Sequence, residues 1–218
     1  MKLYFSPLAC SMATRIALYE SGVDAEFVEV DPRTKRTSRD EDYLQINPLG
    51  LVPVLEDDSG KLLKENVAVL QRVARLSKRA DLALSDADEL QQWLSFISTE
   101  LHKGVFAPVF DRGAPPEVKA YALGKAELRL EYLAAHLEGR DFLLDDFSVA
   151  DAYLVTVLNW LQATPVDLGR WPALKTYYGN LRQRPAVARA LKEERPLYAE
   201  YLRRYAELTP QLAQALGV

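Results

Sequence analysis

The chain contains a single cysteine, Cys10, and its neighbours give that thiol a setting in which it could do chemistry. Residues 3–5 form a short β-prone apolar run, Pro7 interrupts it, and apolar residues recur at helical spacing from Met12 to Tyr19. We therefore expect Cys10 at a helix N-terminus, where unpaired backbone N–H groups and the helix dipole stabilise a thiolate. Such an environment lowers the pKa of a cysteine and makes its sulfur reactive. The alternative is a buried structural thiol, because free cysteine is among the most buried residue types.

A second candidate segment leads into a predicted strand at residues 53–56, which Pro53 opens. If the bond between Val52 and Pro53 is cis, the backbone N–H and C=O of Val52 face outward and could bind an extended peptide as an added strand. A trans bond is the usual form of an X–Pro peptide and is the alternative.

A third candidate segment is the junction between a short strand at residues 61–64 and a helix at residues 66–76. Glu65 offers an acceptor for an ammonium group, and the N-terminus of the following helix offers donors for a carboxylate. An α-amino acid head group carries that pair of charges. The alternative for Glu65 is an acidic residue at a helix start that only interacts with the helix dipole.

The elements that must position these segments fall into two groups. Residues 1–77 read as strand, helix, strand, loop, then two strands and a helix, which predicts a small α/β domain with a mixed sheet. Residues 78–86 read as a polar linker, and residues 87–218 as an all-helical domain with an extended tail. Helices are expected at 88–109, 116–137, 148–163, 172–183 and 186–205, the third opened by a capping box of Ser148 and Asp151.

Composition excludes several classes of function. The formal charge of −4 gives no basic footprint for nucleic acid, and no run of residues is apolar enough for a membrane helix. The N-terminus does not read as a signal peptide, and one cysteine fits a reducing compartment, so we expect a cytoplasmic protein. His102, His136 and Cys10 lie too far apart in sequence to indicate a metal site.

Taken together, the segments resemble the cytosolic glutathione transferases, and among them the bacterial beta class. The resemblance covers roughly residues 1–195 and includes GLVPVL at 50–55, ENVA at 65–68, FISTELHKG at 96–104 and FSVADAYL at 147–154. Cys10 and the Glu-Leu-His-Lys stretch at 100–103 are the class-specific marks. The family implies a thioredoxin-like N-terminal domain, a helical C-terminal domain and a homodimer.

The resemblance also implies roles for individual residues. Cys10 would face the glutathione sulfur, with His102 donating a hydrogen bond or holding a water near the thiolate; the alternative for His102 is an ordinary helix histidine. Glutathione itself would be held by Val52 and Pro53 at its cysteinyl part, by the γ-glutamyl-binding pair Glu65 and Asn66, and by Lys35, Lys103 and Glu100, the last crossing the dimer interface. Phe106, Phe110 and Trp160 would form the walls of the electrophile pocket.

The expected activity is conjugation of glutathione to hydrophobic electrophiles, with thiol transfer or peroxide reduction through Cys10 as related activities. It would need no metal and no cofactor besides glutathione as co-substrate. One alternative is a weakly catalytic or non-catalytic protein that acts through protein partners, since one fold hosts many functions. Another is a glutathione-dependent isomerase or dehalogenase, which would share the same binding half.

The sequence departs from the beta-class pattern at several positions. Phe5 replaces a usual tyrosine, Thr14 and Arg15 replace a Pro-His pair, and Asn66 replaces a glycine or serine. The chain also runs past the usual end, with Tyr198, Tyr201, Leu202 and Tyr205 at helical spacing. We expect this tail to form an added amphipathic helix that covers the substrate cleft or the domain junction.

Overall fold

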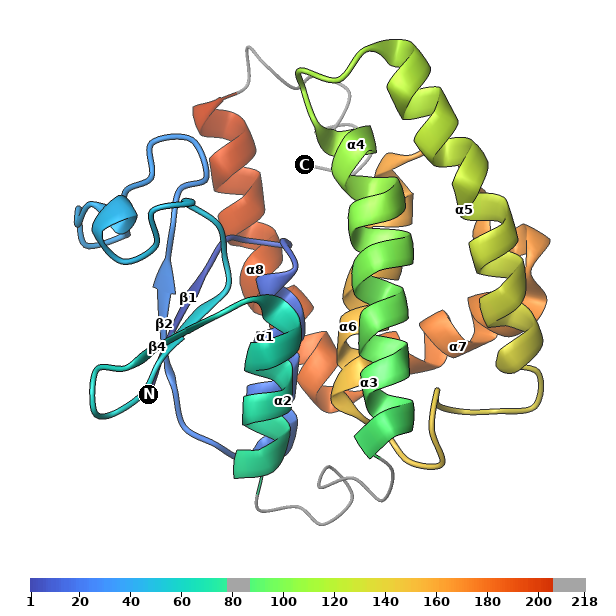
Figure 1. The fold of residues 1–218 in the computed structure, drawn as a ribbon, viewed down its shortest axis with the longest axis horizontal. Coiled ribbons are helices and arrows are strands. Elements are labelled where there is room, and N and C mark those ends of the chain that lie inside the picture. Colours follow the sequence, from blue (N-terminus) through green and yellow to red (C-terminus); the bar gives the residue numbers. More distant parts are fainter. Residues whose placement is uncertain (78–86, 206–218) are drawn as a thin grey trace.

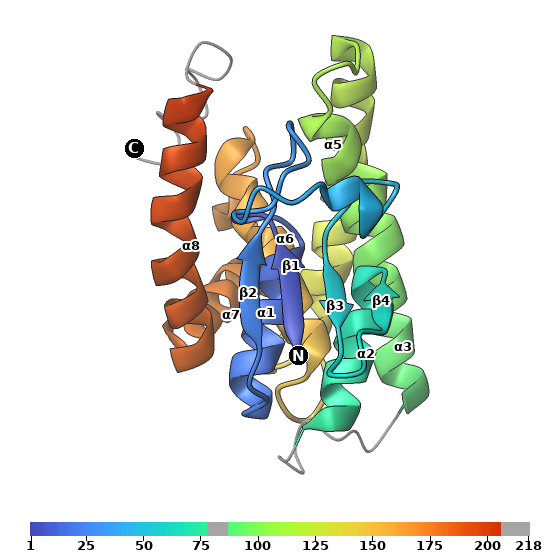
Figure 2. The same ribbon diagram turned by 90° about the vertical axis from the view of Figure 1, so that its left-hand side faces the viewer.

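The N-terminal part of the chain folds into a four-stranded mixed sheet with two helices on one face (Figures 1 and 2). The computed structural model describes residues 1–77 and 87–205. The elements in order are β1 (Lys2–Phe5), α1 (Ser11–Ser21), β2 (Glu26–Glu29), the short helix η1 (Tyr43–Gln45), β3 (Val54–Glu56), β4 (Leu62–Lys64) and α2 (Asn66–Leu76). The predicted α/β class, mixed sheet and thioredoxin-like element order are confirmed.

The sheet order is β2-β1-β3-β4, with β1 parallel to β2 and antiparallel to β3. Alternation along β1 divides its side chains between the two faces of the sheet. Leu3 and Phe5 point into the main core, whereas Tyr4 packs in a second cluster with Tyr43 and Val54. The central strand β1 is thus buried on both faces, and its carboxyl end is fixed where Cys10 follows.

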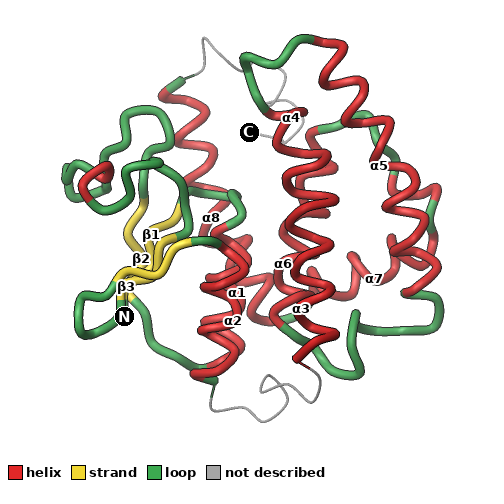
Figure 3. Tube along the Cα trace, in the orientation of Figure 1, coloured by secondary structure: helices red, strands yellow, loops and turns green. Residues whose placement is uncertain are grey.

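The rest of the described chain is helical, as predicted (Figure 3). One long, uninterrupted helix is made of three consecutive segments: α3 (Ala87–Phe96), the π-helical segment η2 (Ile97–Phe106) and α4 (Ala107–Phe110). It is followed by α5 (Pro116–His136), α6 (Val149–Asn159), the short helices η3 (Trp160–Ala163) and η4 (Leu168–Arg170), α7 (Pro172–Gln183) and α8 (Pro185–Arg204). The predicted linker at 78–86 and the tail beyond residue 205 lie outside the described residues.

The π-helical turn depends on Gly104. A Cβ atom at this position would lie 2.7 Å from the carbonyl oxygen of Thr99, a distance that real Cβ atoms do not show. Thr99 and Gly104 are five residues apart, which is the hydrogen-bonding interval of a π-helix. Glycine therefore lets the backbone widen in the segment that carries the Glu-Leu-His-Lys stretch.

Helix α6 joins the two halves of the molecule. Every one of its residues is buried, and its capping box is present, with Asp151 accepting a hydrogen bond of 2.8 Å from the backbone N–H of Ser148. The Asp151 carboxylate also accepts from the hydroxyl of Tyr177, at 2.7 Å, and from the N–H of Leu143. One hydrophobic core runs from β1 and α1 through α6 to α7, so the sheet and the helical part are packed as one body. In the described ranges, no helix is both long enough and apolar enough to span a membrane.

Candidate functional site

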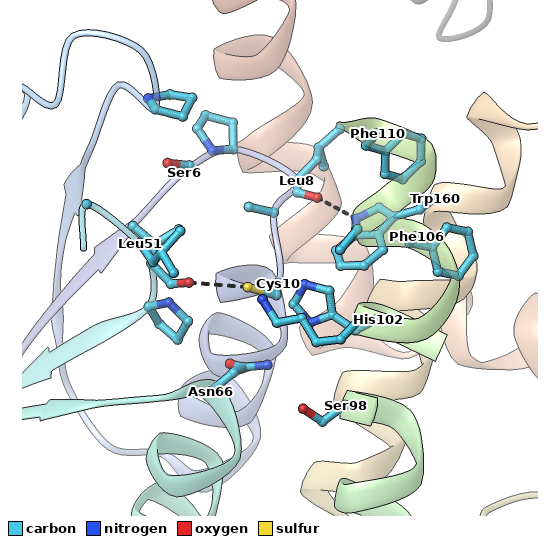
Figure 4. Close-up of a pocket in the computed structure, with 18 of the residues that line it drawn as sticks. Ser6, Leu8, Cys10, Leu51, Asn66, Ser98, His102, Phe106, Phe110 and Trp160 are labelled. Atoms are coloured by element: carbon cyan, nitrogen blue, oxygen red, sulfur yellow. Dashed lines mark hydrogen bonds between the residues drawn. The ribbon is translucent and has the colours of Figure 1, made fainter. Parts of the chain in front are cut away.

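A cleft with a volume of about 940 Å³ lies between the sheet and the helical part, and every predicted site residue except Glu100 lines it (Figure 4). Its walls come from the loop between β1 and α1, the loop before β3, the start of α2, the segment η2 and α4, and the C-terminal part of α8. Sequence-distant segments thus meet at the carboxyl end of β1.

Cys10 stands at the N-terminus of α1, as predicted, and is partly buried in the cleft. Its thiol donates a hydrogen bond of 3.3 Å to the carbonyl oxygen of Val52. The expected lowering of its pKa is wrong for this structure: burial raises the pKa of the thiol to about 11. The positive charge of Lys103 and the backbone N–H groups of Cys10 and Ser11 act in the opposite direction but are weaker than desolvation.

The peptide bond between Val52 and Pro53 is cis, the condition under which Val52 was expected to present its backbone to a ligand. The loop before it is held by two donors to one carbonyl oxygen, that of Leu51. The Tyr43 hydroxyl lies 2.8 Å from that oxygen, and the Asn47 side-chain amide lies 2.7 Å from it. Neither Tyr43 nor Asn47 was recognisable from the sequence as a support of this loop.

Glu65 and Asn66 begin α2 at the floor of the cleft. Glu65 has a φ of +68°, a backbone conformation that costs a residue with a side chain of the order of 1–3 kcal/mol and that clusters at functional sites. Asn66 is only 8% exposed; its Oδ1 accepts from Thr14 Oγ1 at 3.1 Å, while its Nδ2 has no hydrogen-bond partner among the described residues. A buried amide donor without a partner costs free energy unless a ligand satisfies it.

Two lysines border the same region of the cleft. Lys35 donates a hydrogen bond of 3.0 Å to the carbonyl oxygen of Gly50, and Lys103 extends from η2 with its side chain exposed. Gly50 has a φ of +62°, and a Cβ there would come within 2.9 Å of the Lys35 side chain, so glycine is required for this approach. Glu100, in contrast, pairs with Arg129 of α5 and does not line the cleft in this chain. Its expected role across a dimer interface stays a prediction.

His102 lies beside Cys10 in the cleft (Figure 4). The Nδ1 of His102 is 2.6 Å from the hydroxyl oxygen of Tyr153. Burial, with a smaller contribution from Lys103, lowers the pKa of His102 to about 4, so the imidazole is neutral at physiological pH. Burial raises the pKa of Tyr153, which is therefore a neutral phenol. From the sequence, Tyr153 was expected only to lie in the helix at 148–163; the family motif at 147–154 that contains it was the signal that could have identified it.

The three aromatic side chains expected to form an electrophile pocket are brought together. The ring of Phe106 stacks on that of Phe110 with centroids 5.9 Å apart and meets Trp160 edge-on at 5.5 Å. Trp160 is held by a hydrogen bond of 2.8 Å from its Nε1 to the carbonyl oxygen of Leu8. The opposite wall contains Tyr198, Tyr201 and Leu202 from α8, the tail that was expected to cover the cleft or the domain junction. No cluster of three or more metal-binding side chains occurs among residues 1–77 and 87–205.

Comparison with known proteins agrees with this geometry. A family model described as the N-terminal domain of glutathione S-transferase matches residues 1–75, and one described as its C-terminal domain matches residues 93–185. Glutathione S-transferase GstA of Escherichia coli O157:H7 is 38% identical over 200 residues, covering 89% of this chain and 98% of that protein.

Two solved structures are similar over the same extent. The structure of a sphingomonad glutathione S-transferase complexed with glutathione has a TM-score of 0.84 and 42% identity, covering 89% of this chain and 98% of that one. A bacterial beta class glutathione S-transferase from Sphingomonas chungbukensis has a TM-score of 0.84 and 39% identity, with the same coverage of 89% and 98%. With both domain models matched and these similarities over nearly the whole of each relative, the chain belongs to the glutathione S-transferase family and groups with its bacterial beta-class members.

Proposed function

We propose that this protein binds glutathione in the cleft and conjugates it to an electrophilic small molecule. The observation that carries the proposal is that Cys10, the Val52 backbone, the unpartnered amide of Asn66, and Lys103 face one cavity. The relatives described above are named glutathione S-transferases, and one of the similar structures is a complex with glutathione. Glutathione is a co-substrate in this proposal, and no other cofactor is needed.

Each charged group of glutathione has a counterpart on the sheet side of the cleft. Glu65 suits the ammonium of the γ-glutamyl group, while the Asn66 amide and the N-terminus of α2 suit its carboxylate. The backbone of Val52, beside Pro53, suits the extended cysteinyl part. Lys35 and Lys103 supply positive charge for the second carboxylate. The glutathione sulfur would then lie next to Cys10.

The chemistry follows from this placement. A bound thiol is a weak nucleophile, and loss of its proton to solvent gives the thiolate that attacks. Lys103 favours the negative charge, and the neutral His102 can donate a hydrogen bond or hold a water beside the sulfur. Because burial raises its own pKa to about 11, Cys10 is a neutral thiol. When glutathione takes up the Val52 carbonyl, the Cys10 proton that this carbonyl accepts in the structure would be donated to the glutathione thiolate instead. This favours conjugation over thiol transfer or peroxide reduction, which would use Cys10 itself as the thiolate.

The second substrate in this proposal is a hydrophobic electrophile that packs against Phe106, Phe110 and Trp160. With this electrophile bound beside the glutathione sulfur, the attack of the thiolate on the electrophile would become an intramolecular step. The isomerase and dehalogenase alternatives share the glutathione half of the cleft and would differ only in this aromatic half.

We also propose a cytoplasmic homodimer. The exposed face of α5 carries large apolar side chains, Tyr121, Leu128 and Tyr132, of the kind that marks an interaction surface. In the homodimer that we propose, Glu100, which pairs with Arg129 of α5, would contribute a carboxylate to the partner's cleft. The single cysteine, free in the structure, suits a reducing compartment.

Calorimetry with reduced glutathione tests the binding half directly. We expect micromolar to millimolar affinity for the wild type, loss of binding in Glu65→Ala, and unchanged binding in Asp24→Asn, an exposed carboxylate far from the cleft. Turnover of an aryl chloride with glutathione then tests catalysis in the wild type and Cys10→Ala. If folded wild type gives no heat with glutathione, the proposal fails and a role through protein partners is the better reading. Binding without turnover would favour a non-conjugating relative.

A further inference from the structure

We propose that the aromatic half of the cleft takes a planar aromatic electrophile that carries a negative charge, of which an aryl halide with a carboxylate is the simplest case. The inference rests on the proposed function, since it assigns a substrate class to the second subsite of the same cleft. Two features carry it: the pocket has two aromatic walls, and two basic side chains at that end of the cleft have no acidic partner among residues 1–77 and 87–205.

The first wall is the group of Phe106, Phe110 and Trp160 described above. The second is the C-terminal part of α8, where the rings of Tyr198 and Tyr201 stack with centroids 5.9 Å apart and planes inclined by 25°. Both tyrosines line the cleft, together with Leu202 of the same helix. Each wall therefore presents aromatic rings to the cleft, against which a flat aromatic molecule would pack.

The second wall is held in place by a set of contacts between α8 and the loop after β2. The carboxylate of Asp31 accepts a hydrogen bond of 2.9 Å from the Tyr205 hydroxyl and one of 3.2 Å from Arg204. The guanidinium of Arg33 lies 4.3 Å from the centre of the Tyr205 ring, and its Nε donates to the Tyr201 hydroxyl at 3.3 Å. The aromatic walls are thus preorganised, so little ordering is needed when a ligand enters.

Basic side chains outnumber acidic ones around the cleft. Of the described residues that line it, Glu65 is the only acidic one, whereas five are basic: Lys35, Lys64, Lys103, Arg112 and Lys119. The first three border the proposed glutathione subsite. Arg112 lies just beyond Phe110, and Lys119 lies near the start of α5. That end of the helical part lies at the same end of the molecule as the C-terminal part of α8 (Figure 1).

Arg112 and Lys119 form no ion pair or side-chain hydrogen bond within the part of the chain that the structure describes. Glutathione as a thiolate carries two net negative charges, and the three lysines together with Glu65 already match them. Arg112 and Lys119 are therefore left over for the second substrate. A carboxylate on an aromatic ring would satisfy them with charge-assisted hydrogen bonds, which a neutral ring cannot do.

The reaction for such a substrate balances without any further reactant. The glutathione thiolate forms a bond to the ring carbon that bears the halogen, and the carbon–halogen bond breaks with its electron pair leaving as halide. The thiol proton has passed to solvent before the attack. The ring carboxylate takes no part in the bond changes, so its contribution is to binding and orientation.

The test compares two matched aryl chlorides, 4-chloro-3,5-dinitrobenzoate and the corresponding neutral carboxamide, each corrected for its uncatalysed rate with glutathione. We expect the wild type to prefer the carboxylate in kcat/KM, and the double variant Arg112→Gln/Lys119→Gln to lose about fivefold for the carboxylate while the carboxamide is unchanged. Lys175→Gln is the control, because Lys175 is an exposed lysine of helix α7 that does not line the cleft.

A binding measurement keeps the inference separate from the proposed catalysis. Calorimetry with the two preformed glutathione conjugates, carboxylate and carboxamide, should show the same preference and the same loss in the double variant. Equal affinity of the wild type for both conjugates would overturn the inference even if the protein turns over neutral aryl chlorides, which would leave the proposed function standing. Absence of binding by reduced glutathione would instead overturn the proposed function.

Discussion

The carboxylate of Glu194, on the last described helix, accepts a hydrogen bond of 2.7 Å from the backbone N–H of Leu8, two residues before the cysteine. The same carboxylate lies 2.8 Å from Nε of Arg15, and both side chains are buried, at 0% and 5% exposure. The carbonyl of Leu8 in turn accepts from Trp160. The loop that leads to Cys10 is therefore held from the helical part, by a buried acid on one side and an indole on the other.

This relationship gives a first prediction. Glu194→Ala should lower the free energy of unfolding by about 3–5 kcal/mol, because it leaves the guanidinium of Arg15 buried without one of its two carboxylates and frees the Leu8 N–H. Chemical denaturation of both proteins at one protein concentration measures the difference. Glu200→Ala, an exposed carboxylate later in α8, is the control and should change stability by less than about 1 kcal/mol. Equal stability of Glu194→Ala and wild type would contradict this account.

The lowered pKa of His102 predicts a pH dependence of stability. Its pKa is about 4 in the folded protein against the ordinary histidine value of 6.5, so the unfolded chain binds more protons between these two pH values. Stability should therefore fall as pH drops from about 6.5 to about 4, by up to about 3 kcal/mol from this residue. His102→Asn should reduce that dependence. Denaturation at pH 7.5 and pH 5 for the two proteins measures it, and identical pH slopes would count against a buried neutral imidazole.

The raised pKa of Cys10 predicts a slow thiol. Alkylation by iodoacetamide should be slower than that of free cysteine at pH 8, and its rate should keep rising toward pH 11, because only the thiolate reacts. Lys103→Gln should slow the reaction further, since the lysine charge opposes the rise in pKa. Lys61→Gln, an exposed lysine away from the cleft, should have no effect. A fast reaction that levels off near neutral pH would show a lowered pKa and would restore thiol transfer as the main activity.

The π-helical turn predicts a specific effect of a small substitution. Gly104→Ala places a methyl group 2.7 Å from the Thr99 carbonyl oxygen, so the backbone of η2 must shift. We expect a loss of about 1–3 kcal/mol of stability, and weaker glutathione binding because His102 and Lys103 lie on the same turn. Gly124→Ala on α5 is the control, because a Cβ there meets no atom within 4 Å and alanine favours the helix. Unchanged stability and binding in Gly104→Ala would show that the turn accommodates a side chain.

The sequence by itself determined the order of the elements. Apolar periodicity marked the strands and helices, the capping box marked the start of α6, and Cys10 was placed at a helix N-terminus. These features are local: they depend on residues within one or two turns of each other, so one sequence is enough to read them. Motif resemblance added the family and the residues that would border one cleft.

Only the tertiary structure decided the electrostatic state of the site and the shape of its aromatic half. The helix N-terminus at Cys10 was readable, yet its pKa depends on how deeply the fold buries the thiol, and desolvation outweighs the local effect. The π-helical widening at Gly104 and the hydrogen bond between His102 and Tyr153 depend on how segments far apart in the sequence pack together. In the same way, the tyrosines of α8 read as an amphipathic helix in the sequence, but their place opposite Phe106 and Trp160 comes from the contacts of Asp31 and Arg33 across the fold.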